Sequence, residues 1–391
     1  AICSDPNARC FDWFEVTDVS NLGLAQGVEA PQGFLQPEAL DINDNIAPIV
    51  REREHGWLKS SNGYGWQDEG RSDGRGLDWI IDNDVTTAYT GVPRTDGNPS
   101  CKNPDFQLAG QGGQRGGCKG IWFKLGGLFP IDRVVLHTTP EGKNERFIPD
   151  FVIGTNDADV ERALTDMTNN ANLRERDGYI EWRSNVFVDF DIVHYVQENT
   201  SDSLVLAMPD EPISEIVFGA PYGSWEIAEF HIYGEGFTTE ASYVTELIEL
   251  DDFSSLGDLT WSGEVPAGSR VNLSMRTGDD LTPDIYWRWD HERGGARTRL
   301  DTEGAPLSRS FYNDGDKLSG TEQAGVTPDK DNWEFWSPPV NFNDFRVSLV
   351  GKKPRKFVQL RADFFSDNGE AGGSIDFLEF RVSSPPLASQ V

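Results

Sequence analysis

Short apolar stretches recur along the chain, each about as long as a β-strand and each followed by turn-forming residues. In one of them Val358, Leu360, Ala362 and Phe364 alternate with polar residues, the period-two pattern of a strand with one buried face. The other stretches lie at residues 121–125, 133–138, 151–155, 186–190, 204–207, 216–218, 227–233, 244–250, 271–275, 285–289 and 375–382. Many short strands separated by turns predict an all-β chain of jelly-roll-like β-sandwiches.

The length of 391 residues exceeds what one ordinary core holds, so we expect two domains in tandem. A turn-rich stretch around Gly234 separates the two series of apolar stretches. One short helix, at residues 158–169 behind Asp157 as N-cap, is expected in a loop of the first sandwich. Residues 290–332, rich in Gly, Asp and Arg, are expected to form long loops. The expected organisation is an N-terminal extension (1–40), a first β-sandwich (41–237), a second β-sandwich (242–384) and a C-terminal tail (385–391).

Acidic residues outnumber basic ones, with 65 Asp and Glu against 34 Lys and Arg and a formal net charge of −31. Nucleic acids and anionic lipid surfaces bind through Lys and Arg, so both classes of partner are disfavoured. Calcium ions, a basic protein face or a neutral glycan are favoured, although solubility alone would explain most of these carboxylates. The best apolar run, residues 120–136, is interrupted by Lys124, Asp132 and Arg133, so no membrane-spanning segment is predicted.

Four cysteines form two local pairs, Cys3 with Cys10 and Cys101 with Cys118, each closing a loop rich in Gly, Pro, Asn or Asp. An even number of cysteines in short loops predicts disulfides and an oxidising compartment. Zinc binding is the less favoured alternative, because neither pair has the spacing of a zinc knuckle. The chain begins at Ala1, as a mature chain does after removal of a signal peptide. We therefore expect a periplasmic or extracellular protein.

Residues 81–89, Ile-Asp-Asn-Asp-Val-Thr-Thr-Ala-Tyr, resemble the signature of discoidin domains, the coagulation-factor-type and carbohydrate-binding jelly rolls. Two residues depart from the family pattern, Asn83 where Gly is usual and Tyr89 where Trp is usual. The resemblance covers residues 65–236 and implies a discoidin-like, galactose-binding-like jelly roll. Further segments similar to the family follow in the family's order, at residues 120–126, 131–136, 151–156 and 227–234.

Residues 242–384 resemble a β-sandwich that often accompanies discoidin domains in large bacterial extracellular proteins. The similar features are Trp261, the turn at residues 265–268, the strand that ends at 276–278, and residues 357–361. That module has no general catalytic role, so the resemblance implies none for this half of the chain.

The discoidin resemblance also implies a metal site. In glycan-binding members, the loop of the first motif and the Glu of the last strand commonly meet around Ca²⁺, which would bring Asp84, Thr87 and Glu229 together in this chain. Carboxylate, hydroxyl and carbonyl oxygens are the ligands that a hard cation prefers, and the role expected for the ion is structural. In the alternative, Asp82 and Asp84 only stabilise a turn and Glu229 forms an internal salt bridge.

Glycan binding needs an exposed aromatic platform, and several aromatic residues lie in Gly- and Ser-rich segments that are typical of loops. These candidate ligand-binding residues are Trp57, Tyr64, Trp66, Tyr222 and Trp225. The alternative for each is packing in the interior, because a chain with twelve Trp must bury most of them.

No catalytic motif stands out, since the five His are widely separated and no nucleophile-elbow, zinc-protease or P-loop sequence occurs. We therefore expect a protein that is not an enzyme and that uses no redox cofactor. The function ranked first is an accessory or scaffold subunit that docks on a larger membrane-associated or surface complex, such as an electron-transfer or photosynthetic assembly. The alternative is a carbohydrate-binding adhesion module with a Ca²⁺-stabilised discoidin domain. An enzyme with an unrecognised site ranks third.

Overall fold

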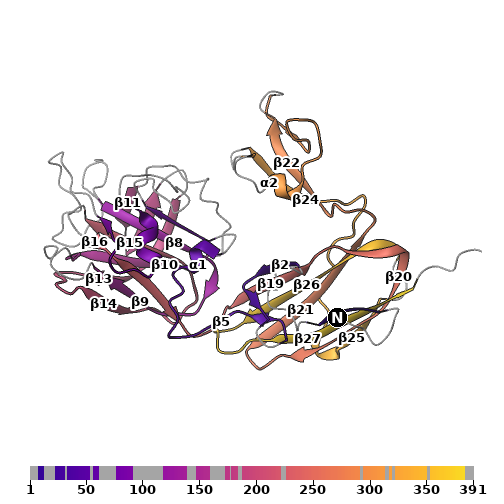
Figure 1. The fold of residues 1–391 in the computed structure, drawn as a ribbon, viewed down its shortest axis with the longest axis horizontal. Coiled ribbons are helices and arrows are strands. Elements are labelled where there is room, and N and C mark those ends of the chain that lie inside the picture. Colours follow the sequence, from indigo (N-terminus) through magenta and orange to yellow (C-terminus); the bar gives the residue numbers. More distant parts are fainter. Residues whose placement is uncertain are drawn as a thin grey trace, which may run out of the picture. The chain divides into compact units, whose positions relative to one another are not determined.

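A computed structural model gives the structure of the protein. It describes residues 8–12, 23–30, 33–52, 56–60, 76–90, 118–138, 147–158, 172–176, 178–183, 187–221, 226–290, 294–312, 317–318, 322–349 and 353–383. The chain divides into two compact units, residues 39–238 and residues 1–38 together with 239–391 (Figure 1). Nearly all regular structure in the described residues is β-strand, which confirms the all-β prediction. Among them, no helix is long and apolar enough to cross a membrane.

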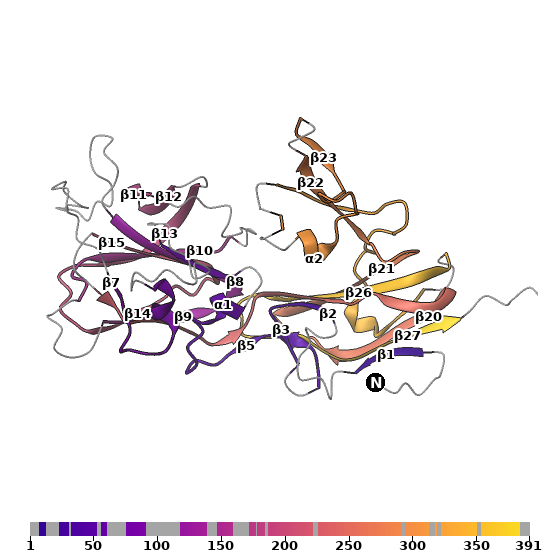
Figure 2. The ribbon, with the colours of Figure 1, turned by 45° about the horizontal axis from the view of Figure 1, so that its top comes forward.

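Residues 39–238 form a β-sandwich. One layer is a seven-stranded sheet in the order β11-β12-β13-β10-β15-β8-β6. The other layer contains the three-stranded sheet β14-β9-β17 and the short pair β16-β7 (Figure 2). The strands are β6 (Trp57–Ser60), β7 (Tyr89–Thr90), β8 (Cys118–Phe129), β9 (Ile131–His137), β10 (Phe151–Asn156), β11 (Asn172–Arg176), β12 (Tyr179–Arg183), β13 (Phe187–Val196), β14 (Ser203–Ala207), β15 (Ile213–Pro221), β16 (Glu226–Ile227) and β17 (Glu229–Gly234).

The main core of this unit lies between the two layers. Ile121, Phe123 and Leu125 alternate along β8 and are buried there. Phe230 and Ile232 enter the same core from β17, in the opposite layer. The rings of Phe123 and Phe230 stack with their centroids 4.4 Å apart. The short helices α1 (Ile49–Glu52) and η2 (Leu77–Ile81), the second a 3₁₀ helix, add buried residues to this core.

The seven-stranded sheet is buried on its other face as well. Trp122, next to Phe123 on β8, points to this second face and has no exposed surface. Its ring centroid lies 4.8 Å from that of Trp57, 5.3 Å from that of Trp182 and 5.1 Å from that of Phe190. Strands β11, β12 and β13 supply most of the other residues of this second core. Burial on both faces explains why β8 is a nearly continuous apolar run.

Residues 1–38 and 239–391 form a second β-sandwich. Its long strand β20 (Ile248–Glu264) pairs with β26 near its start and with β27 from Ser255 onward, so it belongs to both sheets. The strand order is β1-β27-β20-β26-β19-β2, with β21 added on β26 and β25 on β20. The other strands are β1 (Ala8–Asp12), β2 (Gly23–Gln26), β19 (Glu240–Thr245), β21 (Ser269–Gly278), β25 (Arg346–Ser348), β26 (Arg355–Ser366) and β27 (Ser374–Ser383).

The alternation predicted within β26 is confirmed. The apolar members are all buried in the core of the second sandwich, namely Val358, Leu360, Ala362 and Phe364. Gln359, on the other face, is also buried. Its side chain accepts a hydrogen bond from Arg276 at 2.8 Å and donates one to the Thr245 carbonyl at 2.9 Å. A polar residue at an apparently exposed position of the pattern is therefore buried because its hydrogen bonds are satisfied.

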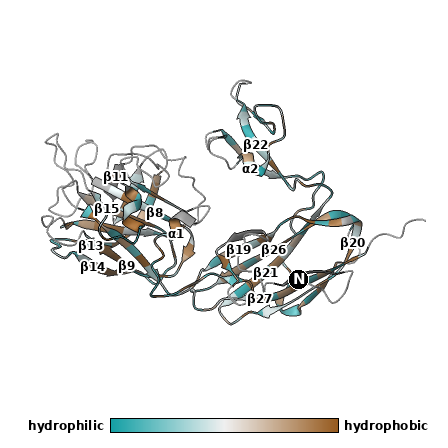
Figure 3. Ribbon diagram, in the orientation of Figure 1, coloured by the Kyte–Doolittle hydropathy of each residue, from teal (hydrophilic) through white to brown (hydrophobic). Residues whose placement is uncertain are grey.

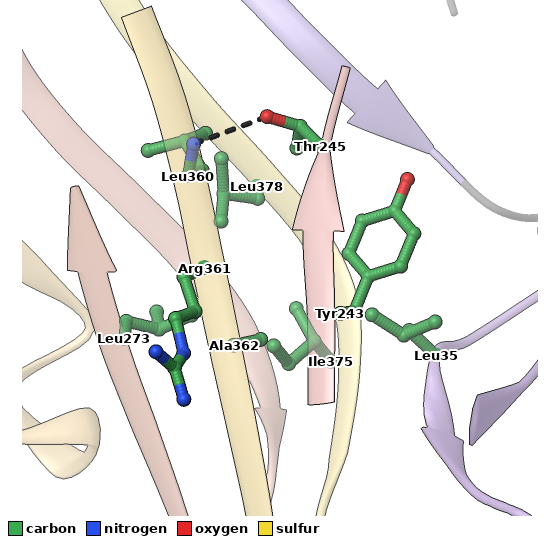
Figure 4. Close-up of a pocket in the computed structure, with 9 residues that line it drawn as sticks. All are labelled: Leu35, Tyr243, Thr245, Leu273, Leu360, Arg361, Ala362, Ile375 and Leu378. Atoms are coloured by element: carbon green, nitrogen blue, oxygen red, sulfur yellow. Dashed lines mark hydrogen bonds between the residues drawn. The ribbon is translucent and has the colours of Figure 1, made fainter. Parts of the chain in front are cut away.

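The N-terminal segment belongs to the second sandwich, whereas the sequence suggested a separate extension at residues 1–40. β1 pairs with β27 and β2 pairs with β19. Leu35 is fully buried and exchanges two backbone hydrogen bonds of 2.8 Å with Ile375. Figure 4 shows Leu35 with Tyr243 and Ile375 in a small, mainly apolar pocket of the core. The remaining lining residues are Thr245, Leu273, Leu360, Arg361, Ala362 and Leu378.

Residues 39–238 are thus inserted in the chain between two parts of the second sandwich. β5 (Ala39–Leu40) pairs with β18 (Gly236–Phe237), so the chain enters and leaves this unit at adjacent positions. Two smaller strands, β3 (Val28–Glu29) and β4 (Gln36–Pro37), pair just before the entry point. The second unit resumes at Thr239, close to the boundary that the turn-rich stretch predicted.

A small three-stranded sheet, β23-β22-β24, lies between β21 and β25 in the sequence. Its strands are β22 (Asp284–Asp290), β23 (Ala296–Thr298) and β24 (Gln323–Pro328), and the short helix α2 (Arg309–Tyr312) lies between the last two in the sequence. The prediction of long loops at 290–332 missed these two strands and the helix. Gly, Asp and Arg dilute the apolar pattern there, and a three-residue strand is too short to show a period.

Each apolar stretch predicted as a strand overlaps a strand of the structure. Figure 3 shows hydrophobic positions along the strands of both sandwiches. The helix expected at 158–169 lies outside the described residues except for Ala158, which is not helical. The short strands β11 and β12 were missed.

Replacing Leu35 by Ala should destabilise the second sandwich by about 2–5 kcal/mol, the usual cost of truncating a buried Leu. Urea unfolding of the full chain, followed by circular dichroism, measures the loss. Val205→Ala is the control, because Val205 is 60% exposed on β14 of the other unit. Equal midpoints for L35A and the wild type would show that the N-terminal residues do not stabilise this core.

Candidate functional site

The first discoidin-like motif forms a tight turn directly after η2. The main-chain N–H of Asp84 donates to Asp82 Oδ1 at 2.9 Å, and that of Thr86 donates to Asp84 Oδ1 at 2.9 Å. Asn83, the middle residue of the first of these turns, has a left-handed φ of 63°. Asn tolerates this conformation better than any residue except Gly, which explains why it can stand where the family pattern has Gly. The Asn45 side-chain amide donates to Asn83 Oδ1 at 3.0 Å.

Thr87 closes the turn onto its own beginning. Its N–H donates to the Asp84 carbonyl at 3.0 Å. Its hydroxyl lies 2.9 Å from Asp82 Oδ2 and 2.9 Å from the same carbonyl. The carboxyl group of Asp84, by contrast, is exposed and binds the hydroxyl of Thr86 at 2.6 Å. These hydrogen bonds from Thr86 lower the pKa of Asp84.

Glu229, the first residue of β17, has no exposed surface. Neither of its carboxyl oxygens has a hydrogen-bond partner among the described residues. The nearest basic group is His231, whose Nε2 lies 3.4 Å from Glu229 Oε2 without the geometry of a hydrogen bond. Burial is the main cause that raises the pKa of Glu229; His231 and the main-chain N–H of Asp84 lower it, and the carboxyl group of Asp82 raises it further. The turn and the last strand therefore meet at Glu229.

A buried carboxyl group without hydrogen bonds costs several kcal/mol of folding free energy unless it is protonated or paired with a cation. The Glu229 and Asp82 carboxyl groups meet here, and the Thr87 hydroxyl links Asp82 Oδ2 to the Asp84 carbonyl. These oxygens are of the kinds that bind a hard cation. Among the described residues, no three His, Cys, Asp or Glu side chains converge as a metal-ligand set. A cation at this position would therefore need hydroxyl and main-chain oxygens in addition to the two carboxylates.

The calcium site predicted at Asp84, Thr87 and Glu229 stays a prediction. Asp84 directs its carboxyl group to Thr86, and it is Asp82 whose carboxyl group affects the pKa of Glu229. Towards Glu229, Asp84 contributes its main-chain N–H. The order of two Asp residues two positions apart offers no signal that could have separated these roles.

A pair of histidines lies beside Glu229 on the same sheet. The ring centroids of His137 and His231 are 4.8 Å apart, and His231 Nδ1 lies 3.1 Å from the Tyr233 hydroxyl. The guanidinium of Arg133 lies 4.4 Å above the Tyr233 ring. These residues form a row of polar and aromatic side chains along β9 and β17.

Trp57 is not available to a ligand. The sequence analysis placed it among the candidate platform residues, but it is only 2% exposed and packs against Trp122 in the second core of its unit. Trp57 lies opposite Lys124 in the β6–β8 pair, so its side chain is on the face of the sheet to which Trp122 also points. The other four candidates, Tyr64, Trp66, Tyr222 and Trp225, lie outside the described residues.

The strands that lead to these four residues end on one side of the sheet. Ser60, the last residue of β6, lies opposite Ile121. Pro221, the last residue of β15, lies opposite Cys118, three positions earlier on β8. The described ends of β6 and β15 therefore lie on either side of the first residues of β8.

The predicted disulfides stay predictions. Cys3 and Cys101 lie outside the described residues. The backbones of Cys10 and Cys118 lie in β1 and β8, and their side chains are outside the described part.

No protein-family model matches the chain, and no curated protein does. Among solved structures, it is similar to a GH29 fucosidase of Ruminococcus gnavus (11% identity, 49% of this chain and 27% of that chain, TM-score 0.29). It is also similar to the lectin domain of Lectinolysin complexed with Lewis B antigen (10%, 50% and 99%, 0.27) and to an F5/8 type C domain from Bacteroides fragilis (13%, 46% and 91%, 0.25). Because these TM-scores are all below 0.3, the function below is argued from the residues of the chain itself.

Stability should fall in mild acid because of His137. Burial is the main cause that lowers its pKa below the ordinary 6.5, His231 lowers it further, and Asp202 opposes both. The unfolded chain therefore binds the proton first, and the folded state loses stability as the pH falls below about 6.5. His137→Gln should remove this part of the loss, measured as urea midpoints at neutral and acidic pH. Glu229, which lies opposite His137 on β17, is left unchanged in this variant.

Val205→Ala, at an exposed position of β14 in the same unit, is the control and should keep the wild-type pH dependence, because it removes no titratable group. A wild-type pH profile in H137Q would contradict the assignment.

Proposed function

We propose that residues 39–238 are a non-catalytic, extracellular carbohydrate-binding module in which Ca²⁺ holds the turn at residues 82–87 against β17. The observation that carries the proposal is Glu229. Its carboxyl group is fully buried, neither oxygen has a hydrogen-bond partner in the described part of the chain, and the turn at residues 82–87 lies against it. This is the meeting of first motif and last strand that the discoidin resemblance implies for glycan-binding members.

The positions of the other motifs support the proposal. Residues 81–89 run from the end of η2 into β7. Residues 120–126 lie in β8, 131–136 in β9 and 151–156 in β10. The last motif, 227–234, covers the end of β16 and all of β17. Each similarity that was drawn from sequence therefore falls on the element that the resemblance implies.

A Ca²⁺ ion would neutralise the buried charge of Glu229 and the charge of Asp82 together. The Asp84 carbonyl and the Thr87 hydroxyl would complete the protein's oxygen ligands. The ion would also tie the turn to β17. Thr90 of β7 pairs with Glu226 of β16, so the same tie restrains the strands that lead to residues 91 and 225. The function of the ion is therefore to hold this turn, β7 and β16 in one conformation.

The accessory-subunit function that the sequence analysis ranked first gives way to its alternative. The Glu229 site is specific to the carbohydrate-binding alternative, since docking through a sandwich surface needs no cation at the loop end. The role proposed for residues 39–238 is binding, and the proposal assigns no catalytic step to them.

Calcium should raise the melting temperature of the chain over that in EDTA. An ion bound only by the folded state at 100 times its Kd contributes about 2.7 kcal/mol. Glu229→Gln and Asp82→Asn should each abolish the calcium-dependent increase. The control is Asp191→Asn, which removes the same charge from an exposed position of β13. Identical melting in Ca²⁺ and EDTA would show that Glu229 holds no ion.

The function is tested on a glycan array probed with the full chain in Ca²⁺ and in EDTA. We expect binding to at least one glycan class, with loss of signal in EDTA and in E229Q, and retention in D191N. The signal is lost because, without the ion, the turn at residues 82–87 is no longer tied to β17. Absence of calcium-dependent binding to every glycan would overturn the proposal.

A further inference from the structure

The small sheet of the second unit has one face that carries two indoles and an arginine. Trp287 and Trp289 are two positions apart on β22, so both point to the same face at a spacing of about 6.8 Å. Arg297 of β23 lies directly opposite Trp289 and therefore shares that face. Its guanidinium lies 5.5 Å from the centre of the Trp287 ring. We call these three residues the indole face.

Hydrogen bonds hold this face in one conformation. Trp287 Nε1 donates to the Thr327 hydroxyl on β24 at 2.7 Å, so the polar edge of this indole is directed into the sheet. The main-chain N–H of Trp289 donates to the Glu322 carbonyl at 2.8 Å. Gly325 of β24 has open space where a side chain would be, with no atom within 4 Å. The rings are therefore positioned before any ligand arrives, and rigid aromatic contacts lose little conformational entropy on binding.

The opposite face of the same sheet is occupied by the chain itself. The rings of Tyr286 and Tyr312 pack with centroids 5.1 Å apart, which places α2 against this second face. Arg288 donates to the Leu300 carbonyl at 2.7 Å and to the Asp301 carbonyl at 3.1 Å. The two faces thus differ: one is covered by α2 and its flanking residues, and the other leaves Trp289 37% exposed and Arg297 exposed.

The size of the indole face limits what it can bind. A Trp side chain presents at most about 250 Å², so an exposed fraction of 37% leaves about 90 Å² of Trp289. Trp287 is less exposed than Trp289. The aromatic area therefore stays below about 200 Å², whereas a stable protein interface needs about 800 Å² from each partner. A protein partner or a second copy of this chain is too large for this face, and a ligand of one or two rings fits it.

The chemistry of the face narrows the class of ligand. An indole ring presents a flat apolar surface, and the Arg297 guanidinium adds fixed hydrogen-bond donors that suit hydroxyl or carboxylate oxygens. Among the residues that the structure describes, Arg297 forms no ion pair, so its donors face the solvent. A strongly acidic chain of net charge −31 disfavours nucleic acids and anionic lipids. A saccharide has an apolar ring face and a rim of hydroxyl groups, and both parts find their counterpart here.

We propose that the indole face of Trp287, Trp289 and Arg297 is a second, calcium-independent glycan-binding site, which stacks a sugar ring on Trp289 and hydrogen-bonds its oxygens through Arg297. The site lies in the unit that contains neither Glu229 nor the discoidin-like motifs. It is therefore independent of the function proposed for residues 39–238.

The test is affinity electrophoresis of the full chain, in EDTA, through native gels that contain hydroxyethyl cellulose, galactomannan or polygalacturonate. We expect at least one polysaccharide to retard the wild type. Retardation by the first two indicates a neutral sugar, and retardation by polygalacturonate alone indicates that Arg297 binds a carboxylate. Trp289→Ala should raise the apparent Kd at least tenfold, and Arg297→Ala should weaken binding as well.

Two control variants show whether the retardation comes from the indole face or from another part of the surface. Val326→Ala changes a residue that is 47% exposed on the face covered by α2, so it should be retarded like the wild type. Glu229→Gln should also be retarded like the wild type, because the gels contain no free calcium. The proposal is overturned if no polysaccharide retards the wild type, or if W289A binds as the wild type does. Neither result affects the calcium-dependent binding that E229Q tests on the glycan array.

Discussion

The architecture of residues 39–238 depends on a sheet that is buried on both faces. Alternate residues of β8 enter two different cores, with Phe123 on one side and Trp122 on the other. A strand of this kind cannot shift its register by one residue without exchanging the two cores. The Trp122 indole would then leave the indoles of Trp57 and Trp182, against which it packs. The register of β8 therefore also fixes the positions of β6 and β15, the two strands that pair with it.

The Glu229 site shows how such a rigid frame supports a costly group. Glu229 is placed at the start of β17, and Phe230 beside it is held in the main core by the Phe123 ring. The carboxyl group therefore cannot turn out to water without moving a core residue. Because Glu229 stays buried, its charge has to be removed by a proton or balanced by a cation bound beside the turn. The indole face of the second unit has a different energetic cost. It exposes apolar area to water, whereas the Glu229 site buries a charge.

Part of this could be predicted from sequence, and the reasons for the failures are physical. Strands with a clear period were found, because alternation along the chain is a local property. Leu35 was not recognised as a core residue, since its partner strand lies at the other end of the chain and short isolated strands carry no period. Trp57 has Gly and Ser nearby and was assigned to a loop, although its partner Trp122 buries it. The roles of Asp82 and Asp84 depend on the left-handed φ of the residue between them, which the residue types suggest but do not determine.

The insertion of one unit within the other has a consequence for synthesis. β5 and β18 pair at the two ends of residues 39–238, so all strands of this unit are synthesised before β19. This unit can fold while translation continues. The second sandwich cannot fold this early, because β1 and Leu35 pair with β27, the last strand that the structure describes. β1 is thus made long before its partner strand β27, and during that interval its unpaired edge must be kept from other chains.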